Sequence, residues 1–136
     1  AYAPKASDRG GEPGAYSGDP GSDPMLAEAS PVFIHRLSEI LLEGLGIVRD
    51  EAGLRDALDK VRGLAGESSG GTLRERNRLA LAAAMLESAL NRRESRGAHY
   101  RSDYPETDEK YRRTTAATLE NGEVRIFLRS IPERRA

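Results

Sequence analysis

Apolar residues recur at helical spacing in three segments of the chain. The first segment begins at Ser30 and Pro31, where a good N-cap residue precedes a proline that suits the first helical position. Gly44 and Gly46 supply the signal that ends it. Its apolar positions are Phe33, Ile34, Leu37, Ile40 and Leu41. This periodicity predicts an amphipathic helix with one face toward a core.

The second periodic segment begins at Asp50, whose short carboxylate side chain can cap a helix. Gly53 lies in its first turn and lowers its intrinsic helix propensity slightly. Its apolar stripe consists of Leu54, Ala57, Leu58, Val61 and Leu64. The stretch GESSGG at residues 66–71 then predicts a loop between two helices.

The third periodic segment has the clearest helix start, because Thr72 and Glu75 have the spacing of a capping box. One apolar face holds Leu79, Ala82, Ala83, Leu86 and Leu90, and a second holds Leu73, Leu81 and Met85. Two apolar faces predict that this helix is the central one, and its run of alanines allows close packing. The three segments predict an up-down-up three-helix bundle, similar to a spectrin repeat.

Residues 111–132, YRRTTAATLENGEVRIFLRSIP, have the pattern of a β-hairpin. The pair Asn121-Gly122 is a strong signal for a two-residue hairpin turn. Val124, Ile126 and Leu128 alternate with Arg125, Phe127 and Arg129, so one face of the second strand is apolar and the other is mixed. An isolated hairpin is only marginally stable, and this one is expected to pack on the bundle or on another domain. The fold class is therefore mainly α with a terminal hairpin.

The first 29 residues differ in composition from the rest of the chain. They are rich in Gly, Pro, Ser and Asp and offer little apolar surface to offset the entropy of ordering. We therefore predict a flexible linker at 1–29 and a single domain at 30–136.

Composition excludes several classes of function. The 136-residue chain has a net charge of −1, which gives no overall attraction to nucleic acid or anionic lipid. It contains no cysteine, so disulfides, thiolate metal sites and cysteine nucleophiles are ruled out. Its apolar runs are far shorter than the roughly 20 residues that span a bilayer.

The Arg-rich loop, residues 91–106 with the sequence NRRESRGAHYRSDYPE, concentrates the reactive side chains. A metal site is disfavoured, because His35 and His99 are the only histidines and the chain has no cysteine to join them. Ser95, His99 and Asp103 lie four residues apart, but Gly97 disfavours one continuous helix that would present them as a catalytic triad. A hydrogen-bonded structural loop is the simpler interpretation.

A nucleic-acid surface is the remaining alternative for this loop. Arginines and tyrosines that suit phosphates and bases are Arg92, Arg93, Arg96, Arg101, Tyr100 and Tyr104. The carboxylates interleaved with them are Glu94, Asp103, Glu106, Asp108 and Glu109. Such mixed charge favours ion pairs or docking on a protein over a track for phosphates.

Residues 92–111, RRESRGAHYRSDYPETDEKY, resemble the signature E-S-R-G-x-H-x-R-x-D-[YF]-P-x-x-D of the succinate dehydrogenase/fumarate reductase flavoprotein family, which includes L-aspartate oxidase. The stretch LLEGLGIVRDEAGLRDALDKVRGL upstream is similar to a helical segment of that family, and RNRLALAAAMLESALNRRESRG to its long helix before the signature. The resemblance covers residues from about 33 to 132 in the expected order.

The resemblance implies the C-terminal helical domain of an FAD-dependent oxidoreductase that interconverts succinate and fumarate, with L-aspartate oxidase as the alternative. In that family the flavin-contacting and catalytic residues lie in other domains, so none is expected here: no catalytic, cofactor-binding or metal residue. The implied partners are an FAD-binding domain on the same or a companion chain and an iron-sulfur subunit, without nucleic acid or membrane insertion. The implied location is cytoplasmic, or peripheral on the inner face of the cell membrane through partner subunits. A stand-alone interaction module that reuses the fold is the other alternative.

We then interpret the Arg-rich loop as the element that docks the bundle on the flavin domain. Arginine forks suit paired hydrogen bonds across an interface, and a glycine permits a turn that a Cβ atom would resist. The residues of this docking hypothesis are Glu94, Arg96, Gly97, His99, Arg101 and Asp103.

Overall fold

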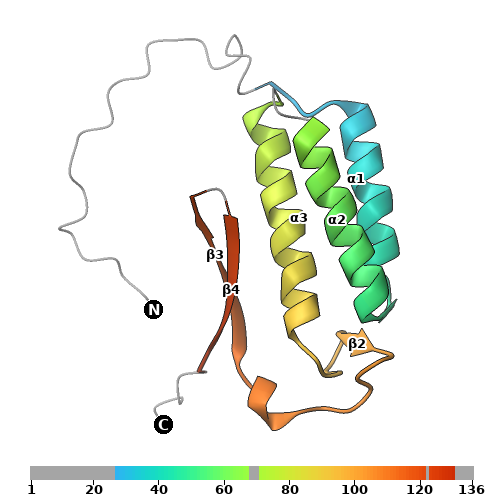
Figure 1. Ribbon diagram of the computed structural model, residues 1–136, viewed down its shortest axis with the longest axis vertical. Helices are drawn as coiled ribbons and strands as arrows, with labels where there is room; N and C mark the ends of the chain where they lie inside the picture. The colour runs from blue at the N-terminus through green and yellow to red at the C-terminus, as the bar shows by residue number, and fades with distance from the viewer. Residues whose placement is uncertain (1–26, 68–70, 122, 131–136) are drawn as a thin grey trace, which may run out of the picture.

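The computed structural model describes residues 27–67, 71–121 and 123–130. Three helices stand side by side, and a β-hairpin packs beyond the third of them (Figure 1). The helices are α1 (Pro31–Gly44), α2 (Glu51–Glu67) and α3 (Leu73–Asn91). The predicted three-helix bundle followed by a hairpin is therefore confirmed. Residues 1–26 of the linker predicted at 1–29 lie outside the described residues.

The helix starts are those that the sequence indicates. The Asp50 side chain accepts a hydrogen bond from the Gly53 amide at 2.7 Å, which caps α2. Thr72 and Glu75 form a capping box at the start of α3. The second Glu75 carboxylate oxygen also accepts a bond from the Ser30 amide at 2.9 Å, so one side chain joins the starts of α1 and α3. That link between residues far apart in the sequence was not predicted.

A single apolar core lies between the helices. Its buried members are Ala29, Phe33, Leu37, Leu54, Ala57, Leu58, Val61, Leu64, Leu79, Ala82, Leu86 and Ala89. The predicted stripe of α2 is buried at every position. Gly44, at the end of α1, faces α2 so closely that an added Cβ atom would lie 2.3 Å from the Ala57 Cβ. This glycine therefore ends the helix and also permits close packing.

The second apolar face predicted for α3 is present only in part. Leu73, Leu81 and Met85 remain 38, 62 and 46% exposed. Leu73 lines the groove beside the hairpin together with Ala80 and Ala83, whereas Leu81 and Met85 do not. Since successive helical residues are rotated by about 100°, positions 80 and 83 point away from positions 81 and 85. The helix does lie between α2 and the hairpin (Figure 1).

The hairpin consists of β3 (Thr114–Glu120) and β4 (Glu123–Arg129). The strands are antiparallel and pair Glu120 with Glu123, so the predicted two-residue connection is confirmed. Asn121 in this turn has a φ of 52°, the left-handed conformation that such turns require. Val124, Ile126 and Leu128 are half-buried and alternate with exposed residues, as predicted.

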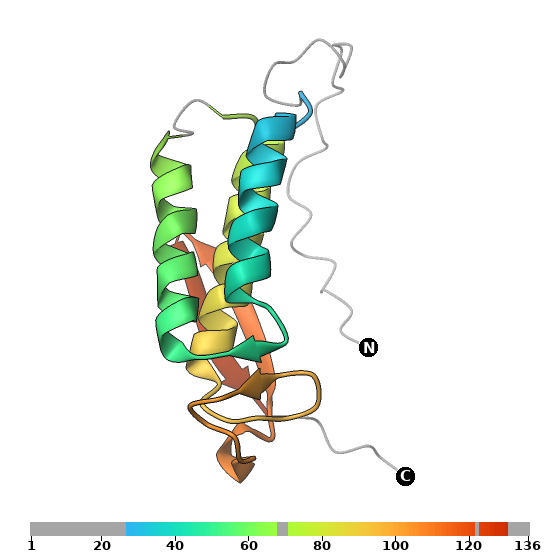
Figure 2. The ribbon, with the colours of Figure 1, turned by 90° about the vertical axis from the view of Figure 1, so that its right-hand side faces the viewer.

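Three short elements were not predicted. Strand β1 (Val48–Arg49) pairs in parallel with β2 (Tyr100–Arg101), and a 3₁₀ helix, η3, spans Glu109–Tyr111. The β1–β2 pair lies beneath the bundle, where α1 ends and α2 begins (Figure 2). It brings the Arg-rich loop against the α1–α2 connection. Among the described residues, we find no helix with both the length and the apolar character that a bilayer crossing needs.

Candidate functional site

The Arg-rich loop crosses the end of the bundle at which α3 stops. Arg101 is one of its two fully buried charged side chains, at 0% exposure. The guanidinium donates to both carboxylate oxygens of Asp103, at 2.7 and 2.6 Å. It also donates to the Ala89 carbonyl at 3.0 Å, in the last turn of α3, where carbonyls lack helical partners. Arg101 therefore closes the C-terminal end of α3.

Asp103 extends this contact to α2. Its carboxylate accepts a bond from the Glu51 amide at 2.9 Å, at the start of that helix. The hydrogen bonds from Arg101 lower the pKa of Asp103 to about 2 despite partial burial. A negative charge at a helix start is favourable, because the first amides carry partial positive charge. The Arg101–Asp103 pair thus joins the end of α3 to the beginning of α2.

Glu94 is the second fully buried charge of the loop, at 0% exposure. Its carboxylate accepts hydrogen bonds from Arg92, from Arg96 Nε at 3.1 Å and from the Asp108 amide at 3.0 Å. Burial acts to raise the pKa of Glu94, but the bonds from Asp108, Arg92 and Arg96 lower it overall. Its charge is therefore satisfied within the domain.

Arg92 connects the loop to the hairpin. Its guanidinium donates to the Tyr111 carbonyl at 2.6 Å, the Arg113 carbonyl at 3.1 Å and Thr115 Oγ1 at 3.0 Å. Tyr111 is itself buried, at 8% exposure. The hairpin is thus held to the end of α3 by one arginine as well as by its apolar face.

His99 connects the loop to the α1–α2 connection. Its Nε2 lies 3.1 Å from the Arg92 carbonyl and its Nδ1 lies 3.3 Å from Arg49 Nη1. These partners assign the neutral ring with the proton on Nε2, since Nδ1 must accept from the guanidinium. Burial lowers the pKa of His99, and the charges of Arg49, Arg101 and Arg92 lower it further.

The loop does not form a catalytic triad. The Ser95 hydroxyl donates to the Tyr104 carbonyl at 2.8 Å and accepts from the Arg101 amide at 2.9 Å. Asp103 is bonded to Arg101, while His99 is bonded to Arg92 and Arg49. The serine, the histidine and the aspartate therefore have structural partners other than one another.

The structure brings the six residues of the docking hypothesis together at one end of the bundle. The side chains of Glu94 and Arg101 point into the domain, while Gly97 is exposed at a turn with a φ of 58°. Arg96 and His99 close this turn with reciprocal backbone bonds of 2.8 and 3.1 Å. The predicted need for a glycine in this turn is confirmed.

Arg49 and Tyr111 were not anticipated as members of this arrangement. Arg49 is separated from His99 by 50 residues of sequence, and its guanidinium also donates to the Leu45 carbonyl at 3.3 Å. No local pattern signals a contact over such a distance. Tyr111 could have been noticed as the aromatic residue between the loop and the hairpin.

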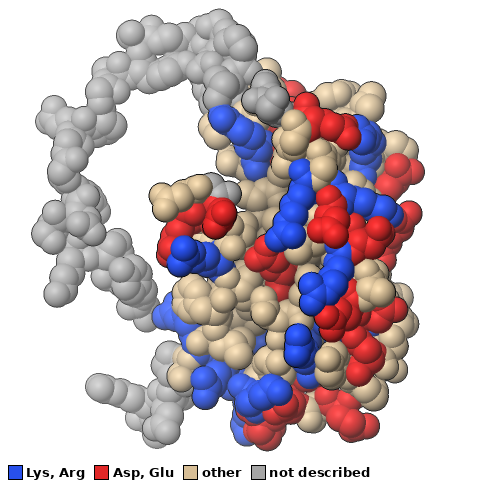
Figure 3. Space-filling model, viewed as in Figure 1, with Lys and Arg blue, Asp and Glu red and all other residues tan. Residues whose placement is uncertain are grey.

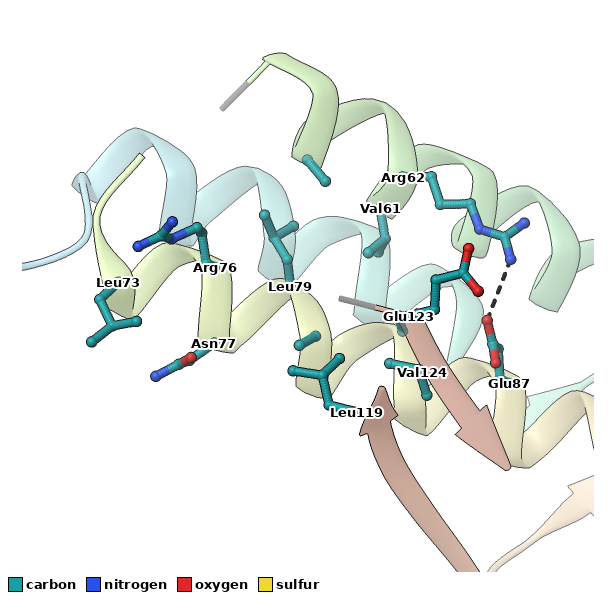
Figure 4. A pocket seen from close by; sticks show the side chains of 13 residues that line it. Val61, Arg62, Leu73, Arg76, Asn77, Leu79, Glu87, Leu119, Glu123 and Val124 are labelled. Carbon is teal, nitrogen blue, oxygen red and sulfur yellow. Dashed lines mark hydrogen bonds and ion pairs between the residues drawn. The ribbon is translucent and has the colours of Figure 1, made fainter. Parts of the chain in front are cut away.

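A separate apolar groove lies between α2, α3 and the tip of the hairpin (Figure 4). Leu119 and Val124 reach from the hairpin toward α3, and an Arg62–Glu87 ion pair of 3.3 Å crosses one rim (Figure 4). None of the six docking residues lines it. Within residues 27–67, 71–121 and 123–130, we find no cluster of three or more histidine or carboxylate side chains that could bind a metal ion.

Charges of both signs mix over α1 and α2, on the right of the face shown in Figure 3. Uncharged surface covers the middle of the hairpin and the neighbouring part of α3, and charges of both signs lie at the hairpin tip (Figure 3). On this face, a continuous basic track of the kind that follows a phosphate backbone is not seen. This mixture of charges on the surface agrees with the mixed charge of the sequence, which disfavours a nucleic-acid surface.

Comparison with known proteins identifies relatives of this fold. Residues 68–134 match the family described as fumarate reductase flavoprotein C-term. L-aspartate oxidase of Pyrococcus furiosus is 37% identical over 91 residues, which are 67% of this chain and 18% of the oxidase. The fumarate reductase flavoprotein subunit of Haemophilus influenzae is 32% identical over 107 residues, 66% of this chain and 18% of that subunit.

Solved structures show the same fold. A chain of the Mycobacterium smegmatis Sdh1 complex has a TM-score of 0.63 and 27% identity, covering 85% of this chain and 23% of that chain. FrdA of Escherichia coli quinol fumarate reductase has a TM-score of 0.63 at 23% identity, covering 74% of this chain and 20% of its own. The chain spans between 14 and 38% of the length of the L-aspartate oxidases that it matches.

Proposed function

Because the chain belongs to the family of fumarate reductase flavoprotein C-terminal domains, we propose that it is a non-catalytic part of an FAD-dependent oxidoreductase of the succinate/fumarate type. It packs against the part of the flavoprotein that holds the flavin and supports the fold of that part. A peripheral place at the membrane, through an iron-sulfur subunit, belongs to the same proposal.

One observation carries the proposal. The reactive side chains of the signature are used inside the domain: Arg101 pairs with Asp103, and Glu94 is fully buried among arginines. A catalytic group must reach substrate, cofactor or a reacting atom. Side chains that are bonded on every side to their own domain stabilise a fold instead.

The residues do not fit the phosphates of FAD. The place that most resembles a dinucleotide site is the start of α2, because a helix follows strand β1 there. Its Glu51 amide is bonded to Asp103 and its Gly53 amide to Asp50, so two carboxylates occupy the position of an anion. The flavin would therefore be held by the rest of the flavoprotein.

We assign docking on the flavin domain to the Arg-rich loop. Glu94, Arg101 and Asp103 fix the shape of the loop from inside. Arg96, Gly97 and His99 form the turn that faces outward, with the Arg96 side chain 35% exposed. The buried charges therefore hold the loop in position, and the turn makes the contact with the flavin domain.

A chimera tests this function. In this chimera, the chain replaces the matching segment of Pyrococcus furiosus L-aspartate oxidase. The absorbance of bound flavin per protein molecule is measured after gel filtration. We expect the chimera to retain FAD and the free chain to bind none. A chimera that loses its flavin, or a free chain that binds FAD or oxidises succinate, would contradict the proposal.

Arg96→Ala in the same chimera tests the loop. We expect lower flavin retention or a lower melting temperature before any change in the chemical step. Arg74→Ala, at the other end of α3, is the control. Flavin content and melting temperature that match the unaltered chimera would argue against docking through this turn.

L-aspartate oxidase is the second candidate for the intact protein. The observation in its favour is 44% identity over 72 residues to the Pyrococcus horikoshii enzyme. The two candidates are compared by building this chain into two chimeras, one with the oxidase and one with the Haemophilus influenzae fumarate reductase subunit. The activity of each chimera is then measured. Full activity in only one of these proteins would assign the chain to that branch.

A further inference from the structure

The β1–β2 pair has two chemically different faces. In a strand, neighbouring side chains point to opposite sides, and the register pairs Val48 with Tyr100 and Arg49 with Arg101. Arg101 is 0% exposed, so the face with the two arginines points into the domain. Val48 and Tyr100 are 60 and 42% exposed on the opposite face. The outward face of this pair is therefore apolar.

Ile47, the residue before β1 in the chain, is also an exposed apolar side chain, at 88%. A side chain of this size gains about 1.5–3 kcal/mol when it leaves water, and here it remains in water. Single exposed apolar residues are ordinary, but adjoining ones mark contact surfaces. We define Ile47, Val48 and Tyr100 as the apolar face of the loop end.

The apolar face is held rigidly from behind. The Ser102 amide donates to the Arg49 carbonyl at 2.8 Å, and the Arg101 amide donates to Ser95 Oγ at 2.9 Å. Arg49 itself is bonded to His99 and to the Leu45 carbonyl. A surface that is already ordered loses little conformational entropy when a partner binds, so it is well suited to docking.

We propose that the apolar face of the loop end is the contact surface for the flavin-binding part of the flavoprotein. This inference rests on the proposed function and specifies which side chains make the contact. Tyr100 belongs to the signature segment itself and follows the turn at Arg96, Gly97 and His99 directly in the chain. Glu94 and Arg101 are fully buried within the domain, whereas Ile47, Val48 and Tyr100 are exposed.

The size of the face also distinguishes between occupants. A stable complex of two free proteins buries roughly 800 Å² on each partner. The exposed parts of three side chains supply only a portion of that area, which is too little for a self-sufficient dimer. It suits a neighbour that other contacts already hold, as in relatives of which this chain spans 18%.

The test uses the Pyrococcus furiosus chimera with Ile47→Asp or Tyr100→Ser. Val32→Asp is the matched control, because Val32 is 68% exposed and lies in the first turn of α1, at the opposite end of the bundle. Loss of FAD after dilution is followed by fluorescence, and hydrogen exchange is measured at residues 47–49. The thermal unfolding of each free chain verifies that the variants fold.

We expect Ile47→Asp to release FAD about tenfold faster, the change that follows from removing one buried aliphatic side chain from an interface. The control variant should match the unaltered chimera. Amides 47–49 should exchange more slowly in the chimera than in the free chain.

Two results together would overturn the docking role of the apolar face and leave the proposed function intact. The first is that the Ile47→Asp chimera releases FAD as slowly as the unaltered chimera. The second is that amides 47–49 exchange equally fast in the chimera and in the free chain. An unaltered chimera that cannot retain FAD would overturn the proposed function first. Sedimentation of the free chain gives the third outcome. A dimer that Ile47→Asp dissociates would assign the face to a second copy and overturn our proposal.

Discussion

Arg101 shows how one residue can carry the organisation of a whole end of the domain. Its guanidinium meets a carboxylate, carbonyls of α3 and the ring of Tyr104, whose centroid lies 5.1 Å away. A lysine could supply the charge but not the planar fork that serves several partners at once. Burial of such a group is tolerated because the structure satisfies its donors.

Arg101→Met should destabilise the free chain by about 3 kcal/mol, because it leaves Asp103 and the last carbonyls of α3 without their donor. Urea unfolding followed by circular dichroism measures the free energy of unfolding. Arg55→Met removes an exposed ion pair with Glu51 and should change it little. Equal effects of the two substitutions would mean that the buried arginine is not structural.

His99 should make stability depend on pH. Its pKa is lowered in the folded chain from an ordinary value of 6.5, so the folded state favours the neutral ring. Its contribution is fully present above pH 6.5 and declines as the pH falls from there through the lower, folded pKa. His99→Gln should therefore flatten the pH dependence of the urea midpoint in this acidic range. An unchanged slope would contradict the assigned neutral ring.

At the scale of elements, the helices were predictable and the contacts between distant segments were not. The stripe of α2 and the capping box of Thr72 and Glu75 are local patterns, and both are present. The β1–β2 pair joins residues about 50 positions apart, and each strand has only two residues, too few to show a period. The burial of Arg101 was also hidden, because arginine is usually exposed.

Gly44 and Gly63 make a matched pair at the scale of helix packing. An added Cβ at Gly44 would lie 2.3 Å from Ala57 Cβ, whereas at Gly63 nothing lies within 4 Å. Gly44→Ala should therefore cost about 1–3 kcal/mol through overpacking. Gly63→Ala should stabilise α2 by about 0.5–1 kcal/mol. Thermal melting compares them, and a stabilising Gly44→Ala would contradict the close contact.

At the scale of the whole molecule, the bundle and the hairpin are joined mainly through α3 and Arg92. The hairpin is half-buried on one face, so its attachment depends on both apolar contact and the bonds from Arg92 to Tyr111, Arg113 and Thr115. The docking residues could be selected from the sequence as a group. Their division into buried and exposed side chains depends on contacts with distant segments, such as those of Arg101 with α3 and of Asp103 with α2.

Arg92→Met should loosen the hairpin more than the bundle. Hydrogen exchange should accelerate about tenfold across residues 114–129, the change expected when roughly 1.4 kcal/mol of attachment is lost. Amides in the middle of α2 should change less. Uniform acceleration across the chain would show instead that bundle and hairpin open as one unit.

The two ends of the bundle are closed by different means, and this gives the domain a direction in which it opens. One end is held by the carboxylate of Glu75, shared by the Ser30 and Thr72 amides, and by an exposed Arg74–Glu28 ion pair of 3.2 Å. The other is held by Arg101, Asp103, Glu94 and their neighbours. Fraying and proteolytic cleavage should therefore begin near residues 27–30. The loop end, which carries the apolar face, would keep its shape while the opposite end opens, and a partner could still bind a partly unfolded domain.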